Sequence, residues 1–369
     1  MEPLIAADCP VTAVPGGGPR NFSISACPGN KGACLPECQQ VARFMREENA
    51  TVVSQRVFSS GGALCDGARA PENGLELGWP VTRLHGNGAR NIGSLNCQLY
   101  AVSGSFVKRI EIDGQTAGGV FEDEDVRCCV LGDLRPRDLA APRPVQAESV
   151  LQQMELALRA AEMDLTDIVR TWFFIDRILD WYGGFNVVRN RFFQDRNLFA
   201  GVLPASTGVG TANSAGAALI ADVLAMKPKR GRLDFRNVAS PLQCPAPDYK
   251  SSFSRAVEVS IAGRRSLFIS GTASIAPDGV TAHVGAVEKQ VALTMTVVER
   301  ILQSRRMSWS DVTRGIAYFK DIDEAPALER YCRDNHIPDL PVVVSSADIC
   351  RDDLLFEIEV DAASVRGTS

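Results

Sequence analysis

Residues 341–361 read PVVVSSADICRDDLLFEIEVD, and this stretch has the pattern of two β-strands joined by a turn. Val342–Val344 are β-branched and suit a buried, pleated strand, whereas the charged run Arg351–Asp353 suits a turn. Residues 355–360 alternate as strand side chains do: one face carries Leu355, Glu357 and Glu359, and the other carries Phe356, Ile358 and Val360. The pattern predicts a hairpin near residue 350.

A carboxylate on an otherwise apolar strand is unfavourable unless water solvates it or it takes part in binding or catalysis. An exposed strand face would explain Glu357 and Glu359 without any function. Glu357, however, is flanked by Phe356 and Ile358, and it follows Cys350 by one predicted hairpin. A partly buried carboxyl has a raised pKa and can donate a proton near neutral pH. Glu357 is therefore the candidate catalytic residue, with Cys350 beside it.

The composition is that of a soluble globular protein with room for two domains. Of the 369 residues, 45% are hydrophobic and 22% are charged, and no apolar run is long enough to cross a membrane. A net charge of -5 without a basic tract makes nucleic acid an unexpected partner. The first residues lack the basic and apolar regions of a secretory signal, so a cytoplasmic location is expected.

Eleven cysteines are spread along the chain, and free thiols are expected where no secretory signal is present. The pair Cys128–Cys129 lies in a strand-like run and is expected to be buried rather than disulfide-bonded. Cys27, Cys34 and Cys38 come closest to a metal-ligand cluster, but their spacing and the presence of only three histidines argue against zinc. No metal and no cofactor are expected.

The second half of the chain repeats the first. Each pair of matching segments lies at the same place relative to a long amphipathic helix: DIVR (167–170) and DVTR (311–314), LPA (203–205) and LPV (340–342), ALIADVLAM (218–226) and LLFEIEVDA (354–362). Such similarity over more than a hundred residues indicates a duplicated domain. At the position of Glu357 the first copy carries Ile220 or Ala221, which suggests one working site.

The predicted fold class is α+β, with two tandem β-β-α-β-α-β domains and an N-terminal loop-rich extension. Residues 1–40 are expected to be irregular, and residues 61–93, rich in Gly, Asn and Pro, to form a loop-rich surface. The predicted domains are residues 1–235, including the extension, and residues 236–369.

The repeated pattern resembles the superfamily of Rid-type imine deaminases. In that superfamily a terminal E-I-E strand supplies a pocket Glu, matched here by Glu357. The loop Ser270–Ser274 (SGTAS) resembles a loop whose amides hold a substrate carboxylate, and Asn186 matches an Asn contributed by a neighbouring subunit. The deaminases also need an Arg at the start of the penultimate strand, where this chain has Val342, and this departure argues against imine deamination.

From about residue 95 to the end, the chain is more similar to a two-domain branch of that superfamily, the chorismatases. The resemblance rests on five segments taken together: ILDWYGGFNVVRNRFF (178–193), PASTGVGTANSAGAALIADVLA (204–225), YKSSFSRAVEV (249–259), FISGTASI (268–275) and ADICRDDLLFEIEV (347–360). It implies Rid-like domains packed as a pseudo-oligomer, with chorismate as the substrate. Rid-type barrels close with three domains, so the resemblance leaves a monomer or a trimer open.

Chorismate has two carboxylates, and these call for Arg, Tyr or backbone amides rather than a metal. Tyr182 and Arg189, seven residues apart, share a face if their helix reaches back to Tyr182, and they are candidates for one carboxylate. A capping Tyr and a solvated Arg are the alternatives. Arg255 is the candidate for the other carboxylate, or else a charge on a strand surface. The amides of Gly271, Thr272 and Ala273 form an anion nest or simply a tight loop.

The resemblance also bears on the product, because a small residue near the catalytic Glu separates two family types. Cys350 lies seven residues before Glu357, as in the type that yields 3-hydroxybenzoate and pyruvate. Ala273 resembles the hydrolytic type, which yields 3,4-dihydroxycyclohexa-1,5-diene-1-carboxylate and pyruvate. The predicted function is a chorismatase of the 3-hydroxybenzoate type. The hydrolytic reaction and a non-catalytic Rid-like binding protein are the alternatives.

Overall fold

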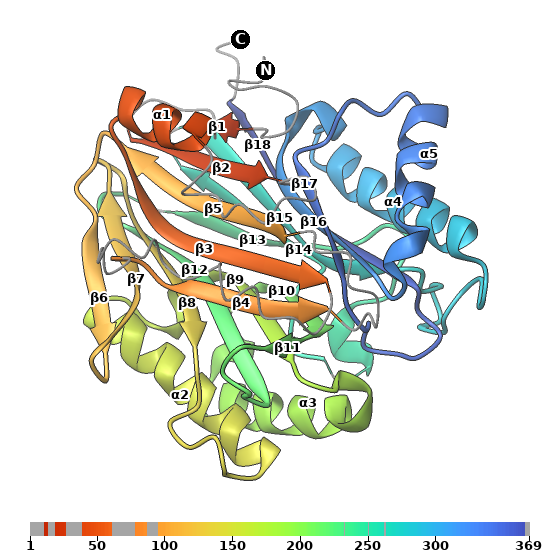
Figure 1. Ribbon diagram of the computed structural model, residues 1–369, viewed down its shortest axis with the longest axis horizontal. Helices are drawn as coiled ribbons and strands as arrows, with labels where there is room; N and C mark the ends of the chain where they lie inside the picture. Colours follow the sequence, from red (N-terminus) through yellow and green to blue (C-terminus); the bar gives the residue numbers. More distant parts are fainter. Residues whose placement is uncertain are drawn as a thin grey trace.

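The computed structural model describes residues 11–13, 19–26, 39–60, 78–86, 95–231, 233–249, 251–261 and 263–365. Within these ranges the chain forms three six-stranded sheets, with the helices on the periphery of the molecule (Figure 1). The inner faces of the sheets share one apolar core, to which the first, second and third sheets contribute Val53, Val169 and Ile316, respectively, among others.

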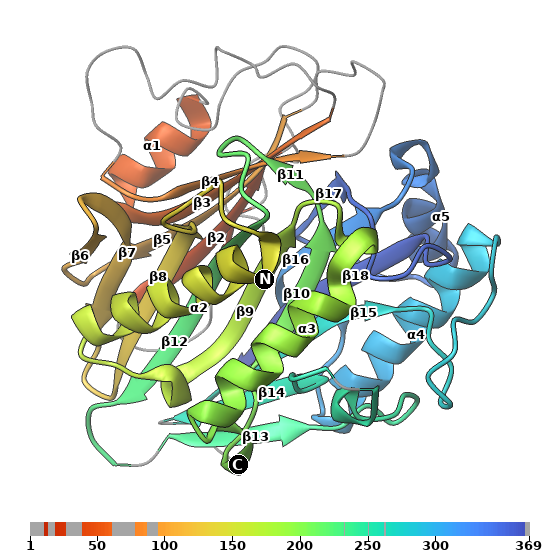
Figure 2. The ribbon, with the colours of Figure 1, turned by 90° about the horizontal axis from the view of Figure 1, so that it is seen from below.

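The second sheet and its helices contain the predicted β-β-α-β-α-β order with one further strand at each end, giving β-β-β-α-β-α-β-β. The elements are β6 (Lys108–Ile112), β7 (Gln115–Glu122), β8 (Val126–Leu134), α2 (Arg143–Ala160), β9 (Ile168–Ile175), α3 (Ile178–Asp195), β10 (Ala205–Gly210) and β12 (Leu219–Pro228). The strands lie in the order β10-β9-β12-β8-β7-β6. Figure 2 shows α2 and α3 side by side, and apolar residues of both helices pack against this sheet.

The third sheet repeats this arrangement. Its elements are β13 (Asp234–Val238), β14 (Ala256–Ile261), β15 (Arg264–Ala273), α4 (Val287–Ser304), β16 (Val312–Phe319), α5 (Pro326–Asp334), β17 (Val342–Ser346) and β18 (Phe356–Val365). The strand order, β17-β16-β18-β15-β14-β13, matches that of the second sheet. The predicted tandem duplication is therefore confirmed, and the predicted boundary after residue 235 falls within β13.

The hairpin predicted for residues 341–361 is wrong, although both of its strands exist. β17 pairs in parallel with β16, and β18 pairs with β16 in antiparallel fashion, so that β16 lies between them. The backbone N–H of Ala347 donates to the carbonyl of Phe319 as the chain leaves β17. The intervening segment crosses the end of β16 instead of reversing tightly, and it carries Cys350 with it.

The strand register identifies the counterpart of Glu357 in the second sheet. Glu357 lies opposite Tyr318, four residues after Arg314 of the DVTR segment, and Ile220 lies opposite Phe174, four residues after Arg170 of the DIVR segment. Of the two residues that the sequence left open, Ile220 is thus the equivalent one. An apolar side chain there means that the second sheet lacks the carboxyl.

A third unit, not predicted from the sequence, lies near the N-terminus. Its elements are β1 (Val11–Ala13), β2 (Arg20–Ala26), α1 (Gln39–Glu47), β3 (Ala50–Ser60), β4 (Val81–Gly86) and β5 (Leu95–Ser103), and β11 (Ala212–Asn213) adds an edge strand. The order β4-β3-β5-β2-β1 follows that of the other two sheets. The expectation of irregular structure was therefore wrong for the residues of β1, β2 and β4.

The three sheets contact one another in turn. In each case the strand that pairs in parallel within its own sheet, namely β4, β10 or β17, reaches the next sheet. Between the first and second sheets, Thr82 Oγ1 donates to Asp222 Oδ1 (2.7 Å). Between the second and third sheets, the backbone N–H of Ser206 donates to Ser270 Oγ (2.8 Å). Between the third and first sheets, Asn96 Nδ2 donates to the carbonyl of Val344 (2.6 Å). One chain thus supplies all three units of this arrangement.

Three buried arginines, one from each sheet, surround Trp172 in the middle of the molecule. The guanidinium carbons of Arg56, Arg170 and Arg314 lie 3.9, 5.0 and 5.2 Å from the centre of a Trp172 ring. Positive charge over an aromatic face is attracted by the ring quadrupole. The indole N–H of Trp172 donates to Glu359 (2.7 Å), which brings a carboxylate into the same cluster.

Carboxylates from β12 and β18 compensate these arginines. The ion pairs are Arg56–Asp222 (2.6 Å), Arg170–Glu359 (2.7 Å), Arg170–Asp361 (2.7 Å), Arg314–Glu359 (2.8 Å) and Arg314–Asp361 (2.7 Å). Burial acts to raise the pKa of Glu359, but Arg170 and Arg314 hold that pKa well below its usual range. Glu359 is therefore a fixed negative charge two residues from Glu357.

Candidate active site

A pocket between the second and third sheets contains all but one of the predicted site residues. It has about 870 Å³ of space not filled by atoms, a volume that includes its opening to solvent. The predicted residues that line it are Tyr182, Asn186, Arg189, Arg255, Gly271, Ala273, Cys350 and Glu357. Thr272 is the exception, because its side chain is buried and its hydroxyl donates to the carbonyl of Ser270 (2.8 Å).

Glu357 lies on β18, with Ala273 of β15 and Tyr318 of β16 as its cross-strand neighbours. Its side chain is buried, at 5% exposure, yet it lines the pocket. Burial, followed by the negative charge of Glu359, raises the pKa of Glu357 to about 8, while Arg255 acts in the opposite direction. The carboxyl is therefore protonated at neutral pH and able to donate its proton.

Gly271 lies directly beside Glu357 in the pocket wall, and the absence of a side chain at this position is essential. A β-carbon built on Gly271 would lie 2.0 Å from Oε1 of Glu357 and 3.3 Å from a methyl carbon of Thr207. The amide of Gly271 donates to Thr207 Oγ1 (3.2 Å), so strand β10 of the second sheet holds this part of β15. This amide is thus committed within the protein, which favours the tight-loop alternative over an anion nest at Gly271.

Helix α3 provides a second wall with an aromatic and a basic residue. The helix has one non-helical residue, Trp181 (φ -151°, ψ 15°), and its regular part begins at Tyr182. Tyr182, Asn186 and Arg189 follow at spacings of four and three and therefore share a face. Arg189 is buried and donates to Oδ1 of Asn186 (2.7 Å), which orients the guanidinium.

The segment before β14 provides the third wall. Arg255 is 5% exposed, which rules out the alternative of a charge on a strand surface. Its Nε donates to the carbonyl of Cys244 (3.0 Å), so that the guanidinium has a fixed position beside the pocket. The side chain of Ser251, in the same segment, hydrogen-bonds Tyr182 and acts to lower its pKa, but burial, the largest influence, keeps the pKa of Tyr182 raised.

Cys350 lies in the loop between β17 and β18 and packs against Ile349, Leu354, Ala273 and Ile275. Burial, followed by the charge of Glu357, raises the pKa of Cys350 to about 12, against the opposing effect of Arg351 and Arg255. The thiol therefore stays neutral and is not a nucleophile at physiological pH. Cys350 and Glu357 share the pocket as predicted, although the hairpin that led to this expectation does not form.

Six residues that line the pocket were not predicted as site residues: Ser206, Gly208, Ser251, Phe253, Ile275 and Arg351. Ser206 and Gly208 lie in the segment PASTGVG, and Ser251 and Phe253 in the segment YKSSFSR, both of which the sequence singled out only as segments. Their clustering depends on packing between two units of the fold, which a linear pattern does not encode. Arg351 was interpreted as a turn residue because it is followed by two aspartates.

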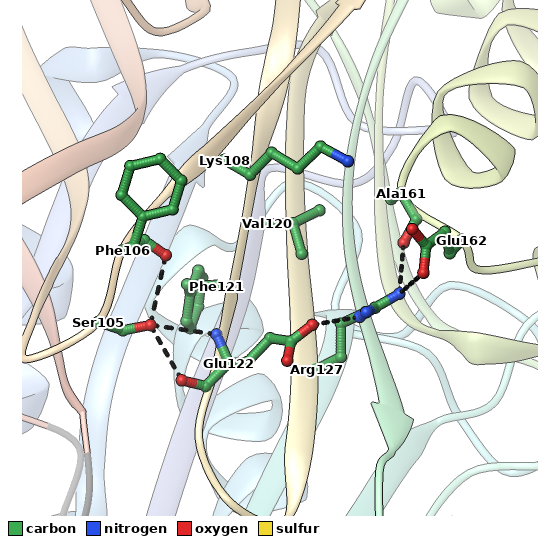
Figure 3. A pocket seen from close by; sticks show the side chains of 9 residues that line it. All are labelled: Ser105, Phe106, Lys108, Val120, Phe121, Glu122, Arg127, Ala161 and Glu162. Carbon is green, nitrogen blue, oxygen red and sulfur yellow. Dashed lines mark hydrogen bonds and ion pairs between the residues drawn. The ribbon is translucent and has the colours of Figure 1, made fainter.

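A second pocket, between β6, β7 and the end of α2, has a different character (Figure 3). Its acidic residues Glu122 and Glu162 both pair with Arg127, at 2.5 and 2.6 Å. A hydrogen bond from Lys229 lowers the pKa of Glu122, and one from Arg127 lowers the pKa of Glu162. Neither carboxyl is a proton donor at neutral pH, so this pocket is not the candidate active site.

Among the described residues, no three His, Cys, Asp or Glu side chains gather closely enough to hold a metal ion. The cluster Cys27, Cys34 and Cys38 lies outside the described residues. No helix of the described part is both long and apolar enough to cross a membrane.

Comparison with known proteins adds two informative relatives. No protein-family model matches the chain. A 3-hydroxybenzoate synthase from Streptomyces hygroscopicus is 28% identical in an alignment 228 residues long, which covers 54% of this chain and 64% of that protein. The matched region thus spans less than two thirds of the relative's length.

Among solved structures, a chorismatase aligns with 95% of this chain and 99% of its own, with a TM-score of 0.65 and 19% identity. RidA from the Antarctic bacterium Psychrobacter aligns over 36% of this chain and 98% of its own, with a TM-score of 0.27 and 15% identity. The chain therefore has the fold of chorismatase, and the resemblance to the chorismatase family that its sequence indicated is confirmed.

Proposed function

We propose that this protein cleaves the enolpyruvyl ether of chorismate, with pyruvate and 3-hydroxybenzoate as the products. The observation that carries the proposal is a buried carboxyl, protonated at neutral pH, in a pocket that also holds the guanidinium groups of Arg189 and Arg255. The activity named for the Streptomyces relative supports the same reaction.

The first step is proton transfer from Glu357 to the methylene carbon of the enolpyruvyl group. The carbon that bears the ether oxygen then becomes an oxocarbenium-like centre, and the Glu357 carboxylate left behind stabilises its positive charge.

The neighbouring ring hydroxyl attacks this centre, returns its proton to Glu357 and forms a cyclic ketal. The ring then loses the proton on the carbon that bears the original ether oxygen, while the bond between the other ring carbon and its oxygen breaks, and the ring becomes aromatic. The remaining hemiketal anion collapses to pyruvate and a phenolate, which takes up a proton to give 3-hydroxybenzoate. Chorismate contains the same atoms as 3-hydroxybenzoate plus pyruvate, so the reaction needs no oxidant and no net water.

The charges of the pocket suit a dianionic substrate. With Glu357 protonated, Arg189 and Arg255 face the pocket without an ionised Glu357 between them. Arg189 with Tyr182 binds one carboxylate, and Arg255 binds the other. Bound carboxylates add negative charge near Glu357, which raises its pKa further and keeps its proton in place until the carbon accepts it.

Cys350 favours the 3-hydroxybenzoate outcome over hydrolysis. A neutral thiol is a weak hydrogen-bond partner and holds a water molecule poorly, so the ring hydroxyl captures the cation before water does. Ala273 also lines the pocket and favours the hydrolytic product by resemblance, so the diene acid is the competing outcome. The adjacent cysteines Cys128 and Cys129 are free thiols, which suits a reducing compartment such as the cytoplasm.

The experiment is incubation of the purified chain with chorismate, with pyruvate measured enzymatically and the ring products separated by chromatography. The wild type is expected to release pyruvate and 3-hydroxybenzoate in equal amounts. Glu357→Gln should release neither, whereas Glu288→Gln, a change at an exposed carboxyl on α4, should match the wild type. A wild-type protein that binds chorismate without releasing pyruvate would instead be a non-catalytic Rid-like binding protein.

A further inference from the structure

Arg351 is a third guanidinium in the pocket. It lies in the turn after Cys350, is half-buried, and lines the cavity together with Arg189 and Arg255. Hydrogen bonds place Arg351 near Arg255. Arg351 donates to the carbonyl of Gly279 (2.7 Å) and Arg255 donates to the carbonyl of Cys244 (3.0 Å), and a β-carbon built on Gly279 would lie 3.8 Å from the sulfur of Cys244. The two arginines are therefore anchored to neighbouring segments, whereas Arg189 projects from α3.

Most of the hydrogen-bonding capacity of Arg351 is uncommitted. Its Nη1 donates to the carbonyl of Gly279 (2.7 Å). A guanidinium has five N–H donors, and throughout the described part of the chain no other hydrogen bond or ion pair involves this side chain. The nearby acids are already engaged, since Asp352 pairs with Lys320 (2.6 Å) and Asp353 accepts from Thr281 (2.9 Å). Donors on a pocket wall that lack a protein acceptor are available to an anionic ligand.

The reaction chemistry indicates which carboxylate lies on this side. Glu357 must reach the enolpyruvyl methylene carbon, and the enolpyruvyl carboxylate is attached to the adjacent carbon. The carbonyl of Arg255 accepts from the amide of Ser270 (3.0 Å), and the β-carbon position of the next residue, Gly271, lies 2.0 Å from Oε1 of Glu357. Arg255 is therefore the arginine placed nearest to Glu357 along the pocket wall, and the enolpyruvyl carboxylate is assigned to its side. The ring carboxylate is then left to Tyr182 and Arg189 on α3.

We propose that Arg351 is a specificity-determining residue, which binds the enolpyruvyl carboxylate together with Arg255 and so selects substrates that carry this second anion. The inference rests on the proposed function and extends it, because it distinguishes the two carboxylate sites and adds a residue to one of them. A carboxylate held by two guanidinium groups is fixed in orientation as well as in position. The enol ether is thereby presented to Glu357.

The contact with Gly279 gives Arg351 a second, structural role that the test must separate. Gly279 (φ +83°) lies in the loop of residues 276–286 between β15 and α4, in which Val280 and Val284 are 61% and 65% exposed. Two side-chain contacts hold this loop against the turn at residues 350–353: the Arg351 bond to Gly279 and the Thr281 bond to Asp353. Thr281→Val removes one of these contacts without changing any charge and is therefore the matched control.

The test measures binding by calorimetric titration in the full chain, with Glu357→Gln as the background so that chorismate is not consumed. The ligands are chorismate, which has both carboxylates, and 3-hydroxybenzoate, which has only the ring carboxylate. Addition of Arg351→Gln should weaken chorismate binding by roughly ten- to a hundredfold, as expected for a lost charge-assisted hydrogen bond. It should weaken 3-hydroxybenzoate binding by less than about threefold, because this ligand lacks the carboxylate that Arg351 binds. Arg351→Lys, which keeps the charge, should recover part of the loss.

Thr281→Val in the same background should leave the affinity for both ligands within about twofold of the parent. If Arg351→Gln weakens the binding of both ligands equally, or if Thr281→Val causes the same loss of affinity, the proposal is overturned. Arg351 would then serve only to hold the loop. Unchanged chorismate binding in Arg351→Gln would also overturn it, while the proposed function stands. If the Glu357→Gln background does not bind chorismate and the wild type does not cleave it, the proposed function itself fails.

Discussion

Oε1 of Glu357 occupies the place where a side chain on Gly271 would begin, only 2.0 Å from the β-carbon position of that glycine. The two residues lie on neighbouring strands, β18 and β15, whose register shifts between Ile269 and Thr272. The irregularity and the missing side chain together make room for a carboxyl at the sheet surface. The acid is therefore positioned by the backbone of the adjacent strand.

Gly271→Ala should inactivate the enzyme without unfolding it. The added methyl group would lie too close to the carboxyl, and Glu357 would have to move out of line with its substrate. We expect kcat for pyruvate release to fall at least a hundredfold, because small misplacements of a catalytic group are costly. Circular dichroism and the melting temperature would report on the fold. Gly201→Ala is the matched control, because the nearest atom to its added carbon is 3.8 Å away, and normal activity is expected there.

Glu357 should make both activity and stability depend on pH. Because the proton donor of the ligand-free protein has a pKa of about 8, kcat/KM should decline as the pH rises through this value. The folded-state pKa lies above the unfolded value of about 4.3, so the stability that the protonated carboxyl provides is complete below pH 4.3 and is lost as the pH rises toward 8.

Compared with the wild type, Glu357→Gln should therefore become progressively more stable between these pH values, by up to roughly 1.4 kcal/mol per pH unit, with no further change above pH 8. Urea denaturation of both proteins at several pH values measures the difference. A difference in stability that stays constant with pH would contradict a raised pKa for this carboxyl.

Glu359→Gln should destabilise the fold, because Arg170 and Arg314 would lose a buried partner. Breaking one side of a buried ionic network costs about 3–5 kcal/mol, and chemical denaturation would detect the change. Glu288→Gln, which removes an exposed pair with Arg330, should cost less than about 1 kcal/mol. The same loss of negative charge should lower the pKa of Glu357, so in any folded variant the decline of kcat/KM should begin at a lower pH than in the wild type.

Arg189→Ala should weaken substrate binding. The side chain is oriented by Asn186 and faces the pocket, and loss of a charge-assisted hydrogen bond costs about 1.5–3 kcal/mol. The measurement is KM for chorismate, or the dissociation constant in the Glu357→Gln background. Arg191→Ala, which removes an exposed arginine of the same helix, should behave as the wild type. Unchanged kinetics in Arg189→Ala would show that Arg189 does not bind the substrate.

Cys350→Ala should shift the product ratio toward the dihydroxycyclohexadiene acid. The smaller side chain leaves space in which a water molecule can reach the cationic centre. Chromatography of the products, with pyruvate as the internal reference, gives the ratio directly. Total pyruvate release should change little, because the proton still comes from Glu357. An unchanged ratio would show that Cys350 does not control which product forms.

Sequence patterns located the chemistry of this protein better than its architecture. The alternation around Glu357 and the apolar neighbours on either side were sufficient to predict a buried acid, because both properties are local to one strand. The spacing of Tyr182, Asn186 and Arg189 likewise predicted a shared helix face, since helical periodicity is local. Thr272, whose hydroxyl turns back to its own strand, shows that a motif does not specify the direction of each side chain.

The features that sequence reasoning missed depend on contacts between distant segments. Nothing near Arg56 indicates that it meets Arg170 and Arg314 around Trp172, since these residues come from three different sheets. β2 and β4 were missed because their surroundings are rich in Gly and Pro, which masks short strands. The hairpin prediction was wrong because strand periodicity is the same whether two strands pair directly or with a third strand between them.

The placement of all three units on one chain has a consequence for how the protein behaves on dilution. In an assembly of separate subunits, a pocket built between neighbours disappears when the subunits dissociate, and its occupancy follows their concentration. Here α3 and β18, which form opposite walls of the pocket, belong to the same polypeptide. Specific activity per chain should therefore remain constant at nanomolar enzyme concentrations. A sequence change on one wall also alters a single pocket, and does not recur by symmetry.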